Sequence, residues 1–379
     1  MLQLRTTASG TVKAKVVAEG RSVSVAVAMS GGVDSSVAAL LLKQQGYNVT
    51  GVTMRLWTEP AVHSVVVDGA VENARRVCAM LDIPHRVVDL RAEFKSKVVD
   101  YFAEAYAHGL TPNPCVVCNQ RIKFGWLLAH AIASGADIMA TGHYVRSEWR
   151  DGRYRLLKAR DRRKDQSYFL YRLTQHELAH LLFPLGEYTK GEVRELAQRW
   201  RLPVADREES QETCFIPDKD YRRFLRAYRP ESIRPGPITD RRGRVLGQHK
   251  GLPFYTIGQR SGLGIAAPEP MYVLAIVPDE NKLVVGPRSE LGLSELIAFE
   301  VSYIAGKPPT GPLPITAKIR YQARYEEATL TPLSHDSAQV SFRVDLRDIT
   351  PGQSVVFYDG EEVLGGGIIS TMSHSEYPA

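Results

Sequence analysis

Residues 30–37 read Ser-Gly-Gly-Val-Asp-Ser-Ser-Val and follow the apolar run of residues 23–28. That run is typical of a buried parallel strand. Residues 35–43 have the composition of a helix, which Gly46 would end. A strand, a loop and a helix in this order direct backbone N–H groups and the positive helix end at one place, which suits a phosphate group.

Glycines in this loop let the backbone approach an anion with no Cβ in between. The loop lacks the lysine and the glycine spacing of a Walker A motif, and it lacks the Gly-x-Gly-x-x-Gly dinucleotide pattern. Its Ser-Gly-Gly-x-Asp-Ser pattern resembles the PP-loop of ATP pyrophosphatases, which adenylate an oxygen and release pyrophosphate. The alternative is a turn that only caps a helix, and the order of strand, loop and helix favours the PP-loop.

Length and composition bound the class of protein. The chain has 379 residues, enough for two or three domains, and 44% of them are hydrophobic, so ordinary cores are expected. No apolar run is long enough to span a bilayer. Residues 1–20 lack the apolar stretch of a secretory signal, so a disordered extension is expected there. The four cysteines are too few for a disulfide framework, which predicts a reducing, cytoplasmic setting without a membrane partner.

The net charge of +6 permits a polyanionic partner. Lysine and arginine cluster at residues 150–164, 222–244 and 318–324. Each cluster could be a solvated face. Three of them in one basic chain favour nucleic acid as the partner.

Strand and helix patterns alternate up to about residue 141, which predicts an α/β fold with a doubly wound parallel sheet. Ligands in such sheets bind beyond the carboxyl ends of the strands. Expected strands before that point are 23–28, 47–54, 85–88 and 137–141, with helices at 71–81, 94–108 and 119–134. A hairpin with an Asp-Gly turn is expected at 148–156, helical patterns at 166–200, and strands at 272–277, 282–285, 315–320, 338–344, 354–358 and 364–369. The expected domains are a disordered extension (1–20), a PP-loop catalytic domain (21–217), a small β-rich central domain (218–277) and a C-terminal β-barrel (278–379).

Cysteine placement is the second strong signal. Cys118 follows the proline-stiffened loop 111–117 and lies near the start of a predicted helix, where the positive dipole end would lower the pKa of its thiol. Cys214 lies in a polar loop much later in the chain. Cys78 has apolar neighbours in a predicted helix, so a buried structural thiol is expected there.

With these motifs together, the chain resembles the MnmA-type tRNA-specific 2-thiouridylases over nearly its whole length. The matching stretches are 30–37, 111–124, 140–146, 164–173, 183–187, 210–217, 254–264 and the tail near Gly365. The resemblance implies an ATP-dependent tRNA-uridine 2-sulfurtransferase that acts on the wobble uridine, position 34, of tRNAs for Lys, Glu and Gln. It also implies ATP and Mg²⁺, and a sulfur donor such as a cysteine desulfurase, a sulfur-carrier protein or free sulfide. A monomer is the default expectation.

The resemblance also implies roles for individual residues. Asp34, which could otherwise be a helix cap, would bind the Mg²⁺ that shields the phosphates. Cys118 would be the nucleophile and Cys214 the persulfide carrier. The ATP site would consist of Ala28, Met29, Ser30, Gly31, Gly32, Val33, Asp34, Ser35, Met54 and Gly142. The tRNA contacts would be Asn113, Pro114 and Cys115 at the flipped-out base, and His143, Lys164, Asp165, Gln166, Arg320, Tyr321 and Gln353.

Cys115 departs from the family, in which this position is often an aspartate that could serve as general base. Three interpretations are open. Cys115 is a bystander or backup thiol, or it forms a redox pair with Cys118, or it joins Cys118 and Cys214 in binding a 4Fe–4S cluster whose open iron takes a hydrosulfide. The cluster would give the same product by another route. Zinc is disfavoured because no fourth ligand is evident.

The implied chemistry is consistent with first principles. The uracil C2 oxygen is a poor leaving group, and its adenylation makes it a good one, so that sulfur can displace AMP. The base must leave its stack to reach the site. Two rival functions are a PP-loop enzyme that adenylates a small molecule for amidation, and a non-catalytic tRNA-binding protein. The cysteine contexts disfavour the first, and the intact loop disfavours the second.

Overall fold

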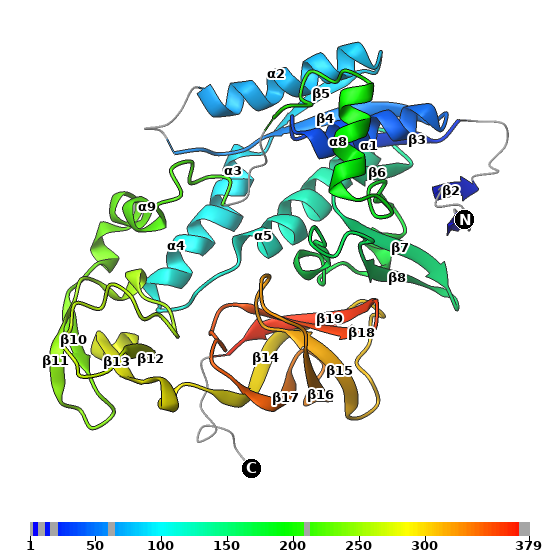
Figure 1. Ribbon diagram of the computed structural model, residues 1–379. Coiled ribbons are helices and arrows are strands. Elements are labelled where there is room, and N and C mark those ends of the chain that lie inside the picture. The colour runs from blue at the N-terminus through cyan, green and yellow to red at the C-terminus, as the bar shows by residue number, and fades with distance from the viewer. Residues whose placement is uncertain (1–2, 7–11, 16–21, 60–64, 208–212, 371–379) are drawn as a thin grey trace.

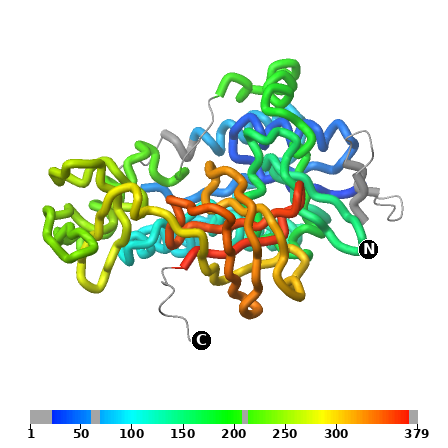
Figure 2. Tube along the Cα trace, turned by 60° about the horizontal axis from the view of Figure 1, so that its bottom comes forward, coloured from blue at the N-terminus to red at the C-terminus, as the bar shows by residue number. Residues whose placement is uncertain are grey.

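The computed structural model describes residues 3–6, 12–15, 22–59, 65–207 and 213–370. An α/β domain is followed by a small β domain and then by a barrel (Figure 1). In Figures 1 and 2 the small β domain lies to one side, and the barrel lies against the α/β domain. Within the described residues, no helix is long and apolar enough to cross a membrane.

The α/β domain is built on the predicted parallel sheet. Its strand order is β5-β4-β3-β6-β9, and every pairing is parallel. Ala28 pairs with Val52 on one side and with Thr141 on the other, so the carboxyl ends of the central strands lie at one edge. The strands are β3 (Ser24–Ala28), β4 (Asn48–Arg55), β5 (His85–Asp89), β6 (Ile138–Thr141) and β9 (Leu181–Leu182).

Helices cover this sheet (Figure 1). The first of them, α1, is buried along its whole apolar run from Val37 to Leu42, as expected for a helix between a sheet and other elements. The helices up to the last central strand are α1 (Val33–Gln44), α2 (Val65–Met80), α3 (Arg91–Phe94), η2 (Lys95–Val99), α4 (Asp100–Ala107), α5 (Pro114–Val117), η3 (Cys118–Leu127) and α6 (Leu128–Ala133).

The helix that carries Cys118 begins earlier than the predicted residue 119. Pro114 occupies its first turn, and the side chain of Asn113 accepts a hydrogen bond from the Val116 backbone N–H at 3.4 Å. Both are typical N-terminal signals. From Cys118 to Leu127 the helix has π-type hydrogen bonding, a wide form that is frequent at functional sites.

The helical pattern predicted over 166–200 is interrupted in the structure. Pro184 and Gly186 lie within it, and a proline removes a helix hydrogen bond. The very short strand β9 was not predicted, because two leucines carry no strand periodicity. The segment forms η4 (Ser167–Phe169), α7 (Gln175–Leu178), β9 and α8 (Lys190–Arg199), and α9 (Tyr221–Tyr228) follows later.

The small β domain is a four-stranded sheet with the order β11-β10-β13-β12. The boundary predicted after Val277 falls between β12 and β13, which pair with each other. The strands are β10 (Gly236–Thr239), β11 (Val245–His249), β12 (Met271–Val277) and β13 (Lys282–Pro287). Near the N-terminus, β1 (Gln3–Thr6) and β2 (Val12–Lys15) pair within the stretch predicted to be a disordered extension.

Six strands close the C-terminal barrel, because β14 pairs with β17 on one side and with β19 on the other. The predicted hairpin of β7 (Val145–Arg150) and β8 (Arg153–Lys158) adds to this sheet through β19. The barrel strands are β14 (Leu293–Tyr303), β15 (Leu313–Lys318), β16 (Glu326–Pro332), β17 (Ala338–Leu346), β18 (Ser354–Asp359) and β19 (Glu362–Ile369). Of these, β14 and β16 were not predicted.

Strand β18 joins two hydrophobic cores. Val355 and Phe357 point into the barrel core, whereas Val356 and Tyr358 belong to the core of the α/β domain. All four side chains are fully buried. Successive strand residues face opposite sides, so one strand can be buried on both faces. The barrel is therefore packed against the α/β domain over apolar surface.

A buried carboxylate holds the hairpin to the barrel, and its removal should destabilise the fold. Glu362 lies 2.7 Å from Arg153 and 2.8 Å from Arg155, and only 11% of its side chain is exposed. We expect Glu362→Gln to lower the free energy of unfolding by about 1–3 kcal/mol, because two partly buried guanidinium groups lose their counter-charge. Urea denaturation measures this.

A matched control is Glu327→Gln. Glu327 pairs with Arg343 on the barrel surface, where the side chains are 63% and 79% exposed. This change should alter the free energy of unfolding by less than about 0.5 kcal/mol. Equal effects of the two substitutions would contradict the structural role given to Glu362.

Candidate active site

The phosphate loop, residues 29–35, lies at the carboxyl edge of the sheet between β3 and α1. Its own hydroxyl groups hold its shape. The Ser30 N–H donates to Ser35 Oγ at 3.1 Å, and the two hydroxyls lie 3.2 Å apart. Ser36 Oγ donates to the Gly32 carbonyl at 2.8 Å. The loop is thus arranged before any ligand is present.

Two glycines are required where neighbouring backbone presses on the loop. Gly31 has φ +70°, and a Cβ there would lie 2.3 Å from the carbonyl oxygen of Ala70 in α2. A Cβ on Gly142, just after β6, would lie 2.8 Å from backbone atoms of Asp34 and Ser35. The loop is therefore enclosed by α2 on one side and by the end of β6 on the other.

The residues predicted for ATP lie at this one edge. Ala28 ends β3, Met54 lies near the end of β4, and Gly142 follows β6, while the predicted residues from Met29 to Ser35 form the loop itself. The sheet therefore brings together residues that are far apart in the sequence.

Asp34 lies in the first turn of α1 and accepts two hydrogen bonds at one oxygen. Tyr144 donates its hydroxyl to Asp34 Oδ1 at 2.8 Å, and Lys190 donates its ammonium to the same oxygen at 2.7 Å. On another side of the loop, Arg207 donates to the Gly31 carbonyl at 2.7 Å. Sequence reasoning missed Tyr144, Lys190 and Arg207, since no local motif marks them.

This arrangement suits Mg²⁺ bound together with a nucleotide. Mg²⁺ prefers carboxylate oxygens and keeps several waters and phosphate oxygens as its other ligands. The Asp34 side chain is about a third exposed, and no described residue donates a hydrogen bond to its Oδ2. Asp34 could hold the ion there, where the ion would neutralise phosphate charge.

Three cysteine thiols gather near Lys123. Cys115 lies in the first turn of the helix, Cys118 follows one turn later, and Cys214 comes from beyond α8. The charge of each of Cys115, Cys118 and Lys123 affects the pKa of Cys214, which places these groups in one small region. All the cysteines are free thiols.

Burial keeps these thiols protonated. Burial raises the pKa of the Cys118 thiol to about 11, although the Lys123 ammonium lowers it in part. Part of the Cys214 side chain reaches solvent, yet desolvation by the surrounding protein raises its pKa to about 12, and Cys118 and Cys115 raise it further. Cys115 also reaches solvent, but desolvation by the surrounding protein raises the pKa of its thiol.

The expectation of a low Cys118 pKa is therefore wrong for this structure. The helix begins at Pro114, so Cys118 lies in its second turn, where the dipole effect is weak. Desolvation of the thiolate is the larger effect. Cys78 agrees with its prediction, because it is buried and burial raises its pKa to about 11.

His143 lies between the phosphate loop and the thiols. Its Nε2 is 3.4 Å from the Lys123 ammonium, and its Nδ1 is 2.8 Å from Thr141 Oγ1. An ammonium only donates, so Nε2 accepts and the ring proton is assigned to Nδ1. Burial, aided by the Lys123 charge, holds the pKa of His143 well below its usual range, so the ring is neutral at pH 7.

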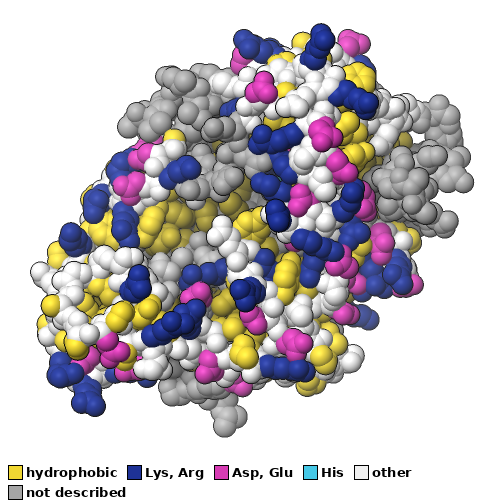
Figure 3. Space-filling model, in the orientation of Figure 1, with side chains coloured by type: hydrophobic (Ala, Val, Ile, Leu, Met, Phe, Trp, Pro, Cys, Tyr) yellow, Lys and Arg dark blue, Asp and Glu magenta, His cyan; other side chains and the backbone are white. Residues whose placement is uncertain are grey.

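A cavity of about 290 Å³ opens beside the thiols. Pro114 and Thr213, which line it, are the neighbours of Cys115 and Cys214. Its walls come from the α/β domain, from residues 213–221 up to the start of α9 and, through Gln353, from the barrel. In Figure 3 the hollowed middle of the visible face shows hydrophobic side chains with Lys and Arg around them.

Several residues predicted to contact tRNA hold other parts of the protein in place. Gln353 donates to the carbonyls of Thr111 and Pro112 at 2.9 and 3.4 Å, which fixes the loop before the thiols. Gln166 accepts from the Tyr144 backbone N–H at 2.9 Å. Arg320 donates to Thr350 Oγ1.

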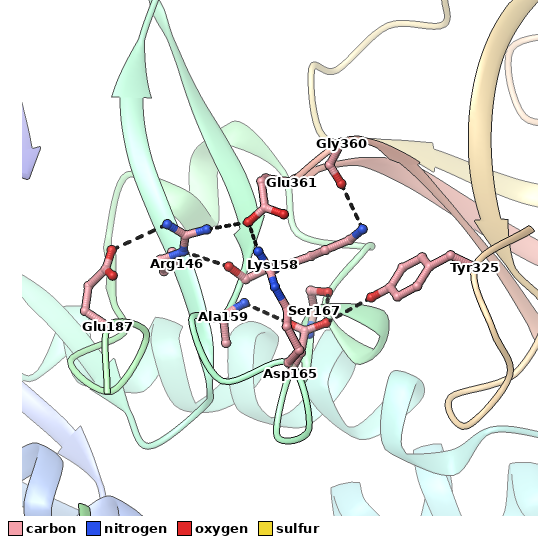
Figure 4. A network of polar contacts seen from close by, with 10 residues as sticks. Arg146, Lys158, Ala159, Asp165, Ser167, Glu187, Tyr325, Gly360 and Glu361 are labelled. Carbon is pink, nitrogen blue, oxygen red and sulfur yellow. Dashed lines mark hydrogen bonds and ion pairs between the residues drawn. The ribbon is translucent and has the colours of Figure 1, made fainter. Parts of the chain in front are cut away.

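Asp165 is buried in a polar network (Figure 4). It accepts hydrogen bonds from the Ala159 N–H at 2.8 Å and from the Ser167 hydroxyl at 2.7 Å. The Tyr325 hydroxyl of the barrel lies 3.5 Å away. This geometry suits a residue that positions its neighbours, such as Lys164, better than one that contacts tRNA itself.

Tyr321, another residue predicted to contact tRNA, lies where the barrel packs against the α/β domain. Its ring lies against that of Phe169, with the ring centroids 4.4 Å apart.

The three basic clusters differ in their ion pairs. In the clusters at 150–164 and 222–244, arginines are paired with carboxylates: Arg155 with Glu362, Arg162 with Glu361, Arg223 with Glu59, Arg229 with Glu104 and Arg244 with Asp240. At 318–324, no described carboxylate pairs with Lys318, Arg320 or Arg324. Lys318 donates to the Tyr321 carbonyl and Arg320 to Thr350, whereas Arg324 is exposed, so Arg324 is the member of this cluster whose charge is most accessible to a polyanion.

The three thiols do not form the ligand set of a metal cluster in this structure. Over the described ranges, which include Cys115, Cys118 and Cys214, no group of three or more Cys, His, Asp or Glu side chains is arranged to hold a metal ion. A 4Fe–4S cluster needs its thiolates converged on one centre.

Comparison with known proteins agrees with this division of the chain. Family models match residues 23–218 (tRNA methyl transferase HUP domain), 222–287 (tRNA methyl transferase PRC-barrel domain) and 293–369 (aminomethyltransferase beta-barrel domain). The tRNA-specific 2-thiouridylase MnmA of Moorella thermoacetica is 52% identical over 92% of this chain and 99% of its own. The MnmA of Carboxydothermus hydrogenoformans is 50% identical over 91% and 97%.

Among solved structures, the chain is similar to the U34-tRNA thiolase NcsA from Methanococcus maripaludis with its [4Fe-4S] cluster. The identity is 21%, the coverage is 55% of this chain and 67% of that chain, and the TM-score is 0.35. A likeness at this level has no bearing on how the three thiols act here.

The raised thiol pKa values predict how the free protein reacts with an alkylating agent. Only thiolate reacts, and its fraction grows about tenfold per pH unit below the pKa. Because the Cys214 pKa is raised to about 12, alkylation of Cys214 by iodoacetamide should keep rising from pH 7 to pH 10. Mass spectrometry of the modified peptide measures the rate. A plateau below pH 8 would contradict the desolvated thiol.

Proposed function

The chain belongs to the family of tRNA-specific 2-thiouridylases, and we propose that it uses ATP to replace the C2 oxygen of the wobble uridine of tRNA with sulfur. The observation that carries the proposal is the placement of a phosphate loop and a group of thiols in one site, with His143 between them. Adenylation takes place at the C2 oxygen and sulfur attacks the C2 carbon bonded to it, so the adenylating centre and the sulfur-transfer centre must be neighbours.

The first step is adenylation. The uracil C2 oxygen attacks the α-phosphorus of ATP, the bond to the β-phosphate oxygen breaks, and pyrophosphate leaves with the electron pair. The amides of the phosphate loop and the N-terminal end of α1 stabilise the negative charge that collects on phosphate. Asp34 would hold Mg²⁺ for the same purpose.

The second step is sulfur transfer. The terminal sulfur of a Cys214 persulfide attacks C2, and AMP leaves with the C2 oxygen. Cys118 then attacks the Cys214 sulfur, which forms a Cys118–Cys214 disulfide and leaves the transferred sulfur on C2 as 2-thiouridine. A thiol reductant restores the two cysteines. The exposed thiol of Cys214 can take a sulfane sulfur from the persulfide of a cysteine desulfurase or of a sulfur-carrier protein, whose own cysteine leaves as a thiol. Free sulfide cannot form this persulfide without an oxidant, and as a donor it would instead attack the adenylated C2 directly and displace AMP.

Cys115 has no required step in this scheme. It is exposed at the helix N-terminus, and its charge raises the pKa of both Cys118 and Cys214. We infer that it is a backup thiol near the relay. The reducing cytoplasm, where such thiols persist, is the setting that this chemistry needs.

The cavity beside the thiols supports the need for a flipped base. Enzymes that act on a base take it out of its stack into a pocket. A pocket of about 290 Å³ lined by the α/β domain, the start of α9 and the barrel would shield part of the adenylated base from water. Water at C2 would only restore uridine. Asn113, Pro114 and Cys115 would face the base, and residues 318–324 would contact the backbone of tRNAs for Lys, Glu and Gln.

The amidating and non-catalytic alternatives differ from this proposal in what they consume. An amidating enzyme would release pyrophosphate without tRNA. A non-catalytic protein would bind tRNA and leave ATP intact.

Two substitutions should separate the two steps. Cys118→Ser should abolish 2-thiouridine formation and leave ATP binding within about twofold, because the loop is intact. Asp34→Ala should instead lower tRNA-dependent pyrophosphate release by about 100-fold. Chromatography of digested tRNA and a coupled pyrophosphate assay give the two readouts. Normal thiolation by Cys118→Ser, or normal ATP turnover by Asp34→Ala, would overturn the assignment.

The unpaired cluster at 318–324 should contribute to tRNA affinity. Arg324 is exposed, and Arg324→Gln should weaken tRNA binding about three- to tenfold and reduce the slope of log K against log salt by about 1. Arg343→Gln, on the same barrel but paired with Glu327, is the control. Filter binding at several salt concentrations tests both. Equal losses for the two variants would argue against a specific tRNA surface.

A further inference from the structure

Lys190 stands beside the phosphate loop although it is far from it in sequence. It is the first residue of α8, and its Nζ lies 2.7 Å from Asp34 Oδ1 in the first turn of α1. Its side chain is only 10% exposed, whereas that of Asp34 is 33% exposed. The lysine therefore approaches the loop from the protein interior, and Asp34 faces the open side.

The phosphate loop itself contains no cation. Residues 29–35 include neither lysine nor arginine, unlike a Walker A loop, whose lysine reaches the phosphates. Backbone amides and a helix end supply only partial charges. A triphosphate that becomes pyrophosphate gains charge on the leaving oxygen, so a full positive charge beside the loop would lower the barrier.

Among the residues that the structure describes, Arg207 and Lys190 are two cations that contact the loop region, and they differ in their partners. Arg207 donates to the Gly31 carbonyl, which is part of the loop backbone, so it braces the loop. Lys190 is bound to a side-chain carboxylate that can turn away or share its charge with Mg²⁺. Tyr144 also donates to this carboxylate, so Asp34 keeps a partner when the lysine moves.

We propose that Lys190 is the catalytic cation of the phosphate loop: it contacts the β- and γ-phosphates of bound ATP and takes up negative charge as pyrophosphate leaves. Asp34 holds Lys190 at the loop in the free protein. The inference rests on the proposed function, because it assigns ATP to this loop. It adds the residue that does the work of a Walker A lysine from a different part of the chain.

Pyrophosphate and AMP distinguish this role from a structural one. Lys190→Met should lower the affinity for pyrophosphate with Mg²⁺ by about tenfold or more, since a charge-assisted hydrogen bond is lost. The affinity for AMP should stay within about twofold, because AMP lacks the β- and γ-phosphates. Isothermal titration calorimetry on the full chain measures both. If the substitution acted only by rearranging Tyr144 or the loop backbone, the affinities for pyrophosphate and for AMP would fall together.

Turnover and control variants complete the test. Lys190→Met should lower tRNA-dependent pyrophosphate release by about 100-fold, and Lys190→Arg should recover part of the loss. The control is Lys43→Met. Lys43 is a partly exposed lysine in the last turn of α1, the helix that carries Asp34, and it pairs with Asp82. Its removal should leave pyrophosphate affinity and turnover unchanged. Circular dichroism checks the fold. If Lys190→Met does not fold, Lys190→Gln, which keeps a donor for Asp34 without the charge, replaces it.

Each result of these measurements either supports or overturns the role given to Lys190. Equal pyrophosphate affinity in the wild type and in the neutral variant overturns the inference, and so does an equal loss of AMP and pyrophosphate affinity. Selective loss of pyrophosphate supports it. A wild-type protein that binds pyrophosphate through Lys190 but forms no 2-thiouridine on tRNA with ATP, a persulfide sulfur donor and a thiol reductant would overturn the proposed function and leave the role of Lys190 standing.

Discussion

The contact between Gly142 and the first turn of α1 is the constraint on which the rest of the site depends. A single added carbon at residue 142 would come within 2.8 Å of the backbone of Asp34 and Ser35. Gly31 is pressed still more closely, because a Cβ there would lie 2.3 Å from the Ala70 carbonyl oxygen. Folding of the sheet therefore fixes the phosphate loop and its amides in place. Binding then needs little further ordering, which favours both affinity and charge stabilisation in the transition state.

The same crowding sets the chemistry of the thiols. Thr141 and His143 flank Gly142, and His143 contacts Lys123 within the group of cysteines. Protein around the thiols keeps them protonated in the free state, although Lys123 opposes this. A protonated thiol is a poor nucleophile and resists oxidation. The neutral ring of His143 lies next to the Lys123 ammonium, beside uncharged thiols.

The barrel completes the site because β18 is buried on both faces. Its neighbouring loop brings Gln353 onto the carbonyls of Thr111 and Pro112, directly before the helix of Cys115 and Cys118. The hairpin β7–β8 ties the barrel to β6 through the chain itself. The groups proposed to face tRNA and those proposed to react with the base are therefore held by one continuous packed body, so a tRNA bound to the barrel would be aligned with the thiols.

The sequence by itself determined what local signals encode. The run before residue 30, the glycines of the loop and the residues after it predicted the strand, loop and helix correctly. The alternation of strand and helix patterns along the chain predicted the parallel sheet. Family resemblance singled out Cys118 and Cys214, and the structure places them together with Cys115. Only the tertiary structure decided which way the thiol pKa values shift, because the helix dipole is local whereas desolvation depends on everything packed around the group. It also decided that Asp165 is buried and that Lys190, Tyr144 and Arg207 reach the phosphate loop. Their contacts join segments more than a hundred residues apart, and no periodicity or motif carries information over such a separation.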